Sequence, residues 1–512
     1  MQDNLKLREQ YPEFIYDSYQ VDRNTDGIHV KYTYKLGEHT FEPTVDIPVS
    51  DIRFSEFNVA FVEYLFFNFG IINAINYYKL SCAPKFIINA GPLDTQQKEF
   101  FKKVFYNGLG EFMYVNQLNI PYEDFMTIEA EEPSDEQSDY ELNDAEFHGN
   151  LIPVGGGKDS VVTLEALQSM HADNLCLQYN RDIYPENRAA HDCITIAGYS
   201  NDSIADFNLT LDKHMLELNQ QGFYNGHIPF SSCLAFAAYI MAYLNNKANI
   251  VLSNEASANE GNIPGTTINH QYSKSFEFEN DFQNYCNTYF TPKIRYFSLL
   301  RCVNEYTIVQ KFLKFPRYLD VFRSCNVGQK TNTWCGHCAK CLYVFIMLYP
   351  FVPIVKLEGI FGQNMLNDQS LSEVFLGLIN PDMTKPFECV GTREEINYSL
   401  KLAFEHTNGN LPILLDYYKK NFYNPQQVFN VENYYNPQHN IPEDYLNMLA
   451  KLWNKILLIS LQANASSFSA TAAKAKVHWS SSRLICQTPN TPLPIRMKFK
   501  SKTSRHIVAK TI

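Results

Sequence analysis

The sequence lacks the features of an exported or membrane-spanning chain. Its N-terminus has no apolar core of the kind that a signal peptide requires. The longest apolar region, residues 57–80, is interrupted by Asn58, Glu63, Asn68, Asn73 and Asn76. We therefore expect this region to be a helix buried in a protein core, with no membrane span, and we expect a cytoplasmic protein.

An excess of positive charge is also missing. Lys and Arg total 43 against 55 for Asp and Glu, which gives a net charge of -12. A general nucleic-acid binder presents a basic surface, so this composition disfavours that class, although a local RNA-binding patch stays open. With 512 residues, 45% of them hydrophobic, the chain is long enough to bury a large core and is expected to form two or three domains.

Shifts in composition predict where these domains begin and end. Residues 129–146 contain no basic residue, which is typical of a solvated linker, and residues 463–512 contain no acidic residue, which is typical here of a disordered tail. The predicted order is an α+β N-terminal domain at 1–126, a linker at 127–148, an α/β domain at 149–350 that contains the glycine loop and the cysteines described below, a helical region at 351–462 and the basic tail at 463–512.

The predicted N-terminal domain contains no obvious chemistry. Residues 28–46 alternate as two strands that meet near Gly37, which indicates a hairpin. The helix at 57–80, a strand at 85–89 and a helix at 95–105 complete it. Its aromatic residues are expected in the core, namely Phe61, Tyr64, Phe66, Phe67 and Phe69.

The segment 151–167 reads as a buried strand, a glycine turn and a helix. Gly155, Gly156 and Gly157 allow the backbone to approach a ligand closely, so that N–H groups and the helix N-terminus converge on an anion. Lys158 adds a positive charge, and Asp159 or Ser160 is expected to cap the helix. We therefore predict a phosphate-binding loop, against the alternative of a simple glycine turn.

This loop does not have the spacing of a Walker A motif. It resembles the Ser-Gly-Gly-x-Asp-Ser loop of the PP-loop ATP pyrophosphatases, with Gly155 where that family usually has Ser. The resemblance implies an α/β fold with a parallel sheet and cleavage of ATP between its α and β phosphates.

The following segments predict the rest of a parallel α/β sheet, with strands at 175–179 and 248–253 and helices at 186–197 and 230–244. Glu255 and Glu260 follow the last strand and are candidate ligands for magnesium or substrate, with a capped turn as the alternative. His227 and His270 lie in predicted loops. They are candidates for proton transfer, or else hydrogen-bonding residues of the structure.

Four cysteines have the spacing of a metal site, with nine residues between the first and second and two between each later pair: Cys325, Cys335, Cys338 and Cys341. Four thiolates would close a tetrahedral shell around a structural zinc ion. An iron–sulfur cluster, free buried thiols and a redox pair stay open as alternatives.

The loop and the cysteines together resemble the 7-cyano-7-deazaguanine synthases, which are shorter. Over about residues 1–460, however, the sequence is more similar to the bacterial UDP-N-acetylmuramoyl-L-alanyl-L-glutamate epimerases. The phrases that carry this resemblance are residues 154–160, 225–230, 252–262, 269–278, 322–326 and 385–391. The segment 386–392 also looks like a functional loop, although a plain connection between helices fits equally well.

The resemblance implies an enzyme of peptidoglycan precursor synthesis that uses ATP and magnesium to invert the terminal L-Glu of a UDP-muramoyl dipeptide. The loop from Gly155 to Ser160, with Lys158, would hold phosphates. Asp159 and Glu255 would bind magnesium, and His227 or His270 would transfer the proton. The alternatives are another carboxylate-adenylating PP-loop enzyme, including an RNA-modifying one, and a non-catalytic nucleotide-binding protein.

Overall fold

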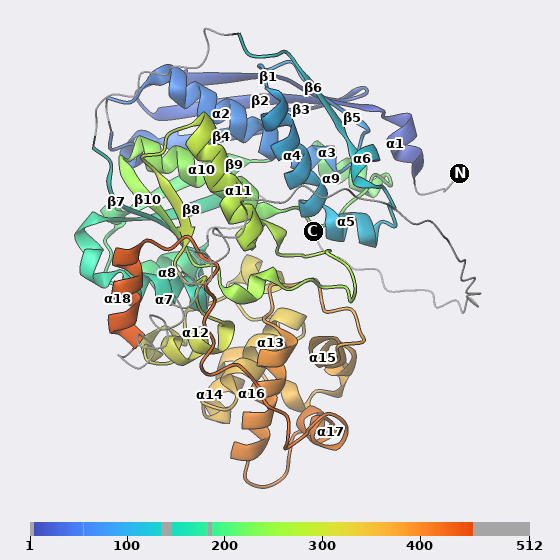
Figure 1. The fold of residues 1–512 in the computed structure, drawn as a ribbon, viewed down its shortest axis with the longest axis vertical. Coiled ribbons are helices and arrows are strands. Elements are labelled where there is room, and N and C mark those ends of the chain that lie inside the picture. Colours follow the sequence, from blue (N-terminus) through green and yellow to red (C-terminus); the bar gives the residue numbers. More distant parts are fainter. Residues whose placement is uncertain (1–4, 55, 135–145, 183–186, 454–512) are drawn as a thin grey trace, which may run out of the picture. The chain divides into compact units, whose positions relative to one another are not determined.

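The computed structural model describes residues 5–54, 56–134, 146–182 and 187–453. Within them eleven strands form one mixed sheet in the order β11-β10-β7-β8-β9-β4-β2-β1-β5-β6, with β3 paired to β2 (Figure 1). The strands are β1 (Glu13–Arg23), β2 (Gly27–Leu36), β3 (His39–Phe41), β4 (Thr44–Pro48), β5 (Lys85–Ile88), β6 (Thr127–Ala130), β7 (His148–Pro153), β8 (Asn174–Arg181), β9 (Ile204–Thr210), β10 (Lys247–Leu252) and β11 (Arg295–Ser298).

Five neighbouring strands, β11-β10-β7-β8-β9, run parallel, which confirms the α/β class. From β7 the chain first adds β8 and β9 on one side and then returns to add β10 and β11 on the other. The order therefore reverses between β7 and β10. In open α/β sheets ligands bind at this switch point, beyond the carboxyl ends of the strands. The glycine loop follows β7, and Glu255 follows β10.

The N-terminal strands continue the same sheet. Strand β4 pairs antiparallel with β9, with Thr44 opposite Thr210, and residues 127–130 of the predicted linker form β6 beside β5. Met1–Leu452 is accordingly one compact unit. The structure thus differs from two domains divided at 127–148, because backbone hydrogen bonds join their strands directly. Residues 135–145 of that segment, and the predicted tail at 463–512, lie outside the described residues.

Several helices of the described residues pack against the sheet, and α13–α17 form a separate group (Figure 1). The helices are α1 (Lys6–Gln10), α2 (Val59–Asn73), α3 (Ile75–Tyr78), α4 (Thr95–Gly108), α5 (Gly110–Val115), α6 (Tyr122–Phe125), α7 (Lys158–Ala166), α8 (Arg188–Ile196), α9 (His214–Gln220), α10 (Phe230–Leu244), α11 (Phe276–Tyr289), α12 (Glu305–Phe312), α13 (Ala339–Leu348), α14 (Ile354–Phe361), α15 (Ser372–Ile379), α16 (Arg393–His406), α17 (Ile413–Asn421) and α18 (Glu443–Trp453). Helices α13–α17 lie together below the strands in Figure 1.

The apolar segment Val59–Tyr78 is long and apolar enough to cross a membrane, but 78% of its 18-residue apolar window is buried inside the protein. Helix α10 packs against α2 and against β7, β8 and β10, so the two apolar helices form a layer of the core. Of the aromatic residues expected there, four are buried and Tyr64 is partly buried. The prediction of a buried helix is confirmed.

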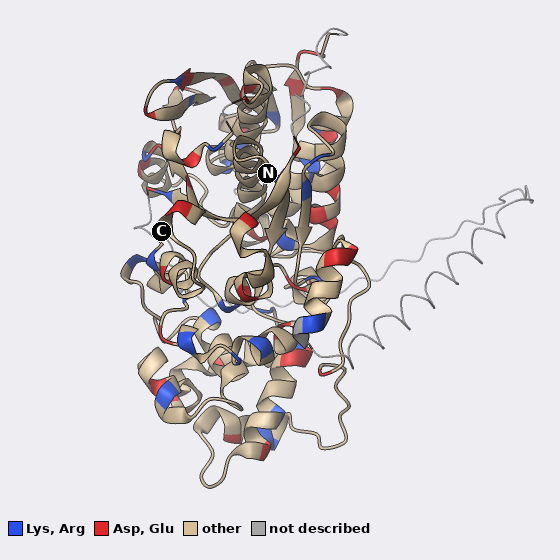
Figure 2. Ribbon diagram, turned by 90° about the vertical axis from the view of Figure 1, so that its left-hand side faces the viewer, with Lys and Arg blue, Asp and Glu red and all other residues tan. Residues whose placement is uncertain are grey.

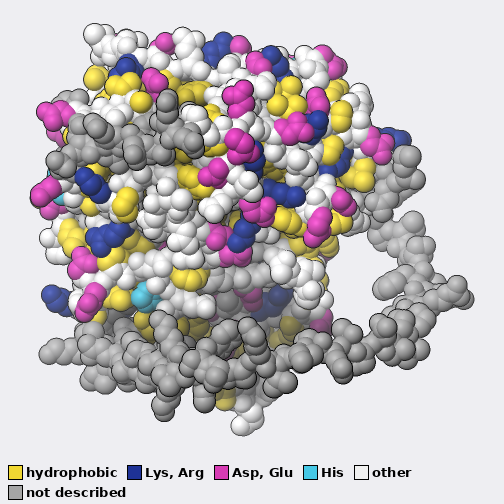
Figure 3. All heavy atoms as spheres, turned by 45° about the horizontal axis from the view of Figure 1, so that its top comes forward, with side chains coloured by type: hydrophobic (Ala, Val, Ile, Leu, Met, Phe, Trp, Pro, Cys, Tyr) yellow, Lys and Arg dark blue, Asp and Glu magenta, His cyan; other side chains and the backbone are white. Residues whose placement is uncertain are grey.

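The predicted hairpin is also confirmed, since β2 and β3 pair across Gly37, which has a φ of +57°. Charged residues of both signs occur throughout the sheet and the helical group (Figure 2). On the face that Figure 3 shows, acidic and basic side chains are interspersed.

Candidate functional site at the switch point of the sheet

The glycine loop leaves β7 and passes close to two other segments. Gly156 has a φ of +81°, and a Cβ there would lie 2.7 Å from backbone atoms of Ala189 and Ala190 in α8. Its carbonyl oxygen accepts a hydrogen bond of 2.8 Å from the Arg323 N–H. Only glycine fits this position. Gly155 is exposed, and a Cβ there would meet no atom within 4 Å, so the loop is open toward solvent on that side.

Helix α7 begins at Lys158, two residues earlier than a cap at Asp159 requires and three earlier than a cap at Ser160 requires. Gly157 is the N-cap and supplies no side-chain cap, while Ser160 Oγ donates a 2.8 Å hydrogen bond back to the Gly157 carbonyl. The predicted capping role is therefore wrong. The first N–H groups of the helix receive no side-chain cap from Gly157, which is the condition under which a helix N-terminus binds an anion.

Lys158 is only 2% exposed and pairs with two carboxylates. Its Nζ lies 2.6 Å from Asp159 Oδ1 and also donates to Glu305 Oε2. Burial opposes the charge of Lys158, but the carboxylates of Asp159, Glu305 and Glu255 outweigh it and raise its pKa. Lys158 is therefore a buried cation behind the loop.

Two buried glutamates complete this cluster. Glu255 follows β10, as predicted, and Glu305 begins α12. Burial and the neighbouring charge of Asp159 raise the pKa of Glu255. Burial raises the pKa of Glu305 to about 7, although Lys158 works in the opposite direction. Carboxylates this crowded favour an added cation, and their oxygens are the ligands that magnesium prefers.

The residues present therefore fit magnesium, with Asp159 and Glu255 as the ligands that the sequence predicts. The sequence did not single out Glu305, because an acidic residue after Asn304 reads as an ordinary capped helix start. Glu260, the other predicted candidate, has a different partner, because its carboxylate pairs with the buried Lys385.

The two predicted histidines come together beside a glutamate. The rings of His227 and His270 are 4.2 Å apart, and Glu111 Oε2 lies 2.5 Å from His270 Nδ1 and 3.8 Å from His227 Nδ1. Burial opposes protonation of His270, but hydrogen bonds with Cys389 and Glu111 raise its pKa to about 10. Burial and the charge of His270 hold the pKa of His227 well below its usual value. At neutral pH His270 is charged and His227 is neutral.

Arg301 holds the two halves of the site together and was not predicted. It is fully buried and donates to the backbone carbonyls of Glu255 (2.7 Å) and Lys274 (2.5 Å). Its charge is balanced by Glu279, whose Oε2 lies 3.0 Å away. Sequence alone offers no signal for such a role, because an arginine after β11 reads as a surface residue.

The four predicted cysteines converge. Their sulfur atoms all lie within 4.8 Å of one another, with Sγ–Sγ distances of 3.8 Å for Cys325 to Cys338, 3.6 Å for Cys335 to Cys341 and 3.5 Å for Cys338 to Cys341. A tetrahedron with Zn–S bonds of about 2.3 Å has edges of about 3.8 Å. The thiols therefore fit a single tetrahedral metal ion such as zinc.

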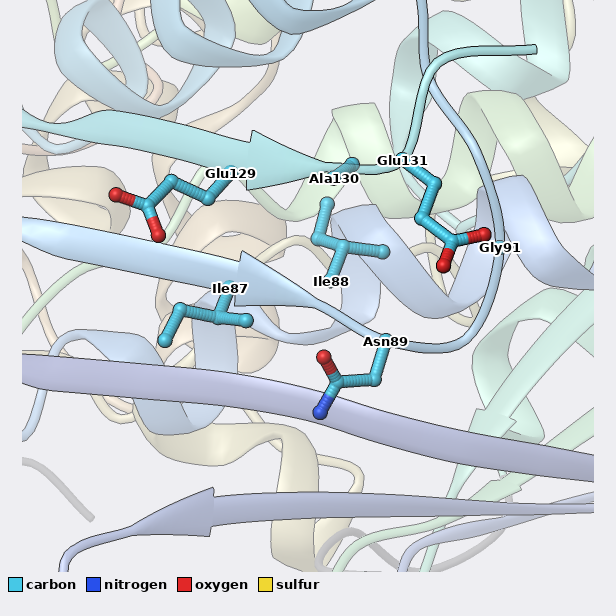
Figure 4. A pocket seen from close by; sticks show the side chains of 7 residues that line it. All are labelled: Ile87, Ile88, Asn89, Gly91, Glu129, Ala130 and Glu131. Carbon is cyan, nitrogen blue, oxygen red and sulfur yellow. The ribbon is translucent and has the colours of Figure 1, made fainter.

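A surface pocket lies near the other edge of the sheet, at the carboxyl ends of β5 and β6 (Figure 4). It is lined by Ile87, Ile88, Asn89, Gly91, Glu129, Ala130 and Glu131. It contains no basic or nucleophilic side chain, and β1, β2, β4, β9 and β8 separate β5 from β7 in the sheet. We assign no chemistry to it.

Fold and site together define an α/β protein with a glycine loop before an uncapped helix N-terminus and a buried cluster of charges at the switch point. Comparison with known families places it more closely. Residues 6–299 match the model of the MurL N-terminal domain and residues 321–428 that of the MurL C-terminal domain. The chain belongs to the MurL family.

Curated relatives agree with this assignment. A protein of Xanthomonas oryzae pv. oryzae named UDP-N-acetyl-alpha-D-muramoyl-L-alanyl-L-glutamate epimerase is 31% identical over 73% of this chain and 82% of its own length. Proteins of the same name from Micromonospora sp. and Salinispora tropica are each 32% identical over 77% of this chain and 87% and 85% of their own lengths. No solved structure matches the chain.

Proposed function

We propose that this protein is an ATP-dependent epimerase that converts the terminal L-Glu of UDP-MurNAc-L-Ala-L-Glu to D-Glu, through a carboxyl adenylate and with release of AMP and diphosphate. Membership of a family whose relatives are named epimerases of this dipeptide supports the reaction and substrate. The observation that carries the ATP step is the uncapped, glycine-rich start of α7 beside buried Lys158 at the switch point.

Adenylation of the carboxylate makes the α-proton of the glutamyl residue easier to remove. The α-proton of a glutamate beside an ionised carboxylate is hard to remove, because a second negative charge develops next to the first. Masking the carboxylate as a mixed anhydride removes that charge and lets nearby donors stabilise an enolate. Reprotonation from the opposite face and hydrolysis then give the epimer. Such a reaction belongs to peptidoglycan precursor synthesis in the cytoplasm.

The residues have distinct roles in this proposal. The N–H groups at Gly157 and the start of α7 bind the phosphates, and Lys158 sets the positive potential behind them. Asp159 and Glu255 would hold magnesium, which when bound neutralises phosphate charge. Lys274 contacts Cys389 and interacts electrostatically with Glu255, so it links the phosphate end of the site to the histidine end.

The test is incubation of the purified protein with the UDP-linked dipeptide, ATP and magnesium, followed by chiral analysis of glutamate and quantification of AMP. We expect one AMP to be formed for each glutamyl residue that is converted to the D form. D-Glu formation without ATP, or formation of ADP, would refute the proposal. A nucleotide-binding protein without activity would retain ATP but show no substrate-dependent exchange of diphosphate into ATP, and an enzyme for another carboxylate would show exchange only with that carboxylate.

A further inference from the structure

The segment between α15 and α16 is held firmly against the candidate site. The Lys385 N–H donates to the Asn262 carbonyl (2.8 Å), and Asn262 Nδ2 donates to the Pro386 carbonyl (2.9 Å). The buried Lys340 donates through Nζ to the backbone carbonyl of Cys389. Contacts from two distant parts of the chain therefore fix the backbone before Cys389 and at its own carbonyl.

The Cys389 side chain meets two cationic groups there. Lys274 Nζ lies 3.2 Å from Cys389 Sγ, and His270, itself paired with Glu111, forms a hydrogen bond with the same thiol. Burial disfavours the thiolate, but Lys274 and His270 outweigh it and hold the pKa of Cys389 well below its usual value. Cys389 remains partly exposed, whereas Cys286, Cys302 and other thiols of the core are buried.

The two histidines are less suited to accept a proton. His270 is already protonated at neutral pH through its bonds with Cys389 and Glu111. His227 is neutral, but its basicity is suppressed by burial and by His270. Its buried Nε2 finds no hydrogen-bond partner among the described residues. Two anionic groups belong to this cluster. Glu111 is already paired with His270, whereas Cys389 is a partly exposed residue whose thiolate is stabilised by Lys274.

Resting on the proposed function, we propose that the Cys389 thiolate is the base that removes the α-proton of the activated glutamyl residue, with Lys274, His270 and Glu111 as positioning residues. The Cα–H bond breaks, an S–H bond forms on Cys389, and the electron pair of the C–H bond moves onto the carbonyl oxygen of the acyl adenylate. A proton that derives from water then adds to the opposite face of Cα. The Cys389 proton returns to water, so the thiolate is regenerated.

Lys274 connects this base to the phosphate end of the site. It interacts with Glu255 and Asp159 as well as with Cys389, and Arg301 holds its backbone carbonyl together with that of Glu255. A glutamyl group whose carboxylate is joined to AMP at the loop would therefore present its α-carbon toward Lys274 and Cys389. Removing the base should spare the formation of the adenylate.

The experiment compares Cys389→Ala and Cys389→Ser with the wild type and with Cys286→Ala, which removes a buried thiol of the core on α11. Substrate-dependent exchange of labelled diphosphate into ATP reports adenylation, and deuterium entry at Cα in heavy water reports proton removal. We expect both Cys389 variants to keep exchange within about threefold and to lose deuterium entry by about 10²-fold or more, as for loss of a general base. Cys286→Ala should retain both activities.

Deuterium entry within tenfold of wild type in Cys389→Ala would overturn the assignment and leave the proposed function standing. If wild-type protein introduces deuterium at Cα without ATP, the adenylate is refuted. The role of Cys389 as the base is then still tested by whether its variants lose this labelling. A second measurement does not depend on the folding of any variant. Iodoacetamide should alkylate Cys389 of the native wild type at pH 6 to 7, and bound substrate should protect it. A Cys389 that reacts only after denaturation would contradict an accessible thiolate.

Discussion

Replacement of Lys158 should separate its role in stability from its role in ATP chemistry. Lys158 and Glu305 are 2% and 1% exposed and pair directly, whereas the Asp159 side chain is 26% exposed and can be hydrated. Lys158→Met therefore leaves one fully buried carboxylate without its partner, that of Glu305. Breaking a buried pair in this way costs about 3–5 kcal/mol. The double variant Lys158→Met/Glu305→Gln removes both charges and should recover most of this loss.

The cost should depend on pH. The pKa of Glu305 is raised from 4.5 to about 7, so its proton is bound more tightly in the folded state and its contribution to stability falls as pH rises from 4.5 to 7. Loss of the Lys158 charge raises this pKa further. The penalty then keeps growing above pH 7, and the gap between Lys158→Met and wild type should widen by about 2 kcal/mol between pH 6 and 8.5, at 1.36 kcal/mol for each unit.

Urea unfolding in magnesium-free buffer at both pH values measures these differences, and AMP formation is assayed on the folded proteins. Both variants should lose AMP formation by about 10²-fold or more, because the positive potential behind the loop is gone. Equal destabilisation of the single and double variants, or a gap that does not change with pH, would refute the reasoning about Glu305.

Other parts of the site give further predictions. Asp159→Asn should lose AMP formation by about 10²-fold while its urea midpoint changes little, because this side chain is partly exposed; normal turnover would remove its metal role. Purified protein should contain one zinc per chain, and Cys335→Ser should lose both metal and stability; metal-free protein with four freely titrating thiols would contradict this. Gly156→Ala should fail to fold or to bind ATP, as a clash at 2.7 Å requires, whereas Gly155→Ala should retain ATP binding in calorimetry.

The sequence predicts the local elements of this fold well. The strand, turn and helix at 151–167 occur as expected, since β7 is buried on both faces and the three glycines suit a close approach. The cysteine spacing places four sulfur atoms together because a Cys-x-x-Cys-x-x-Cys turn is a local feature. The pairing of Glu111 with His270, and the convergence of His270, Lys274 and Cys389, depend on contacts between residues more than 100 positions apart. Hydrophobic periodicity contains no information on such contacts.

The same limit explains what was not anticipated in the sheet. Strands β1, β9 and β11 were not predicted, and β9 is the strand with which β4 pairs. An acidic stretch suggested a boundary at 127–148 because low hydrophobicity and like charges are typical of linkers. Composition along the chain does not show that the strands before and after such a stretch pair through β4 and β9.

The antiparallel pairing of β4 with β9 also determines how the chain tolerates shortening. A fragment that starts after residue 146 would keep the glycine loop and the four cysteines but would leave β9, with its row of backbone N–H and C=O groups, as a bare strand at the margin of the remaining parallel strands. Exposed edge strands pair with the edge strands of other molecules through these backbone groups. The fragment should self-associate through β9, which β4 covers in the intact chain, so the first 126 residues act as a permanent cover for β9 in addition to any contact they make with substrate.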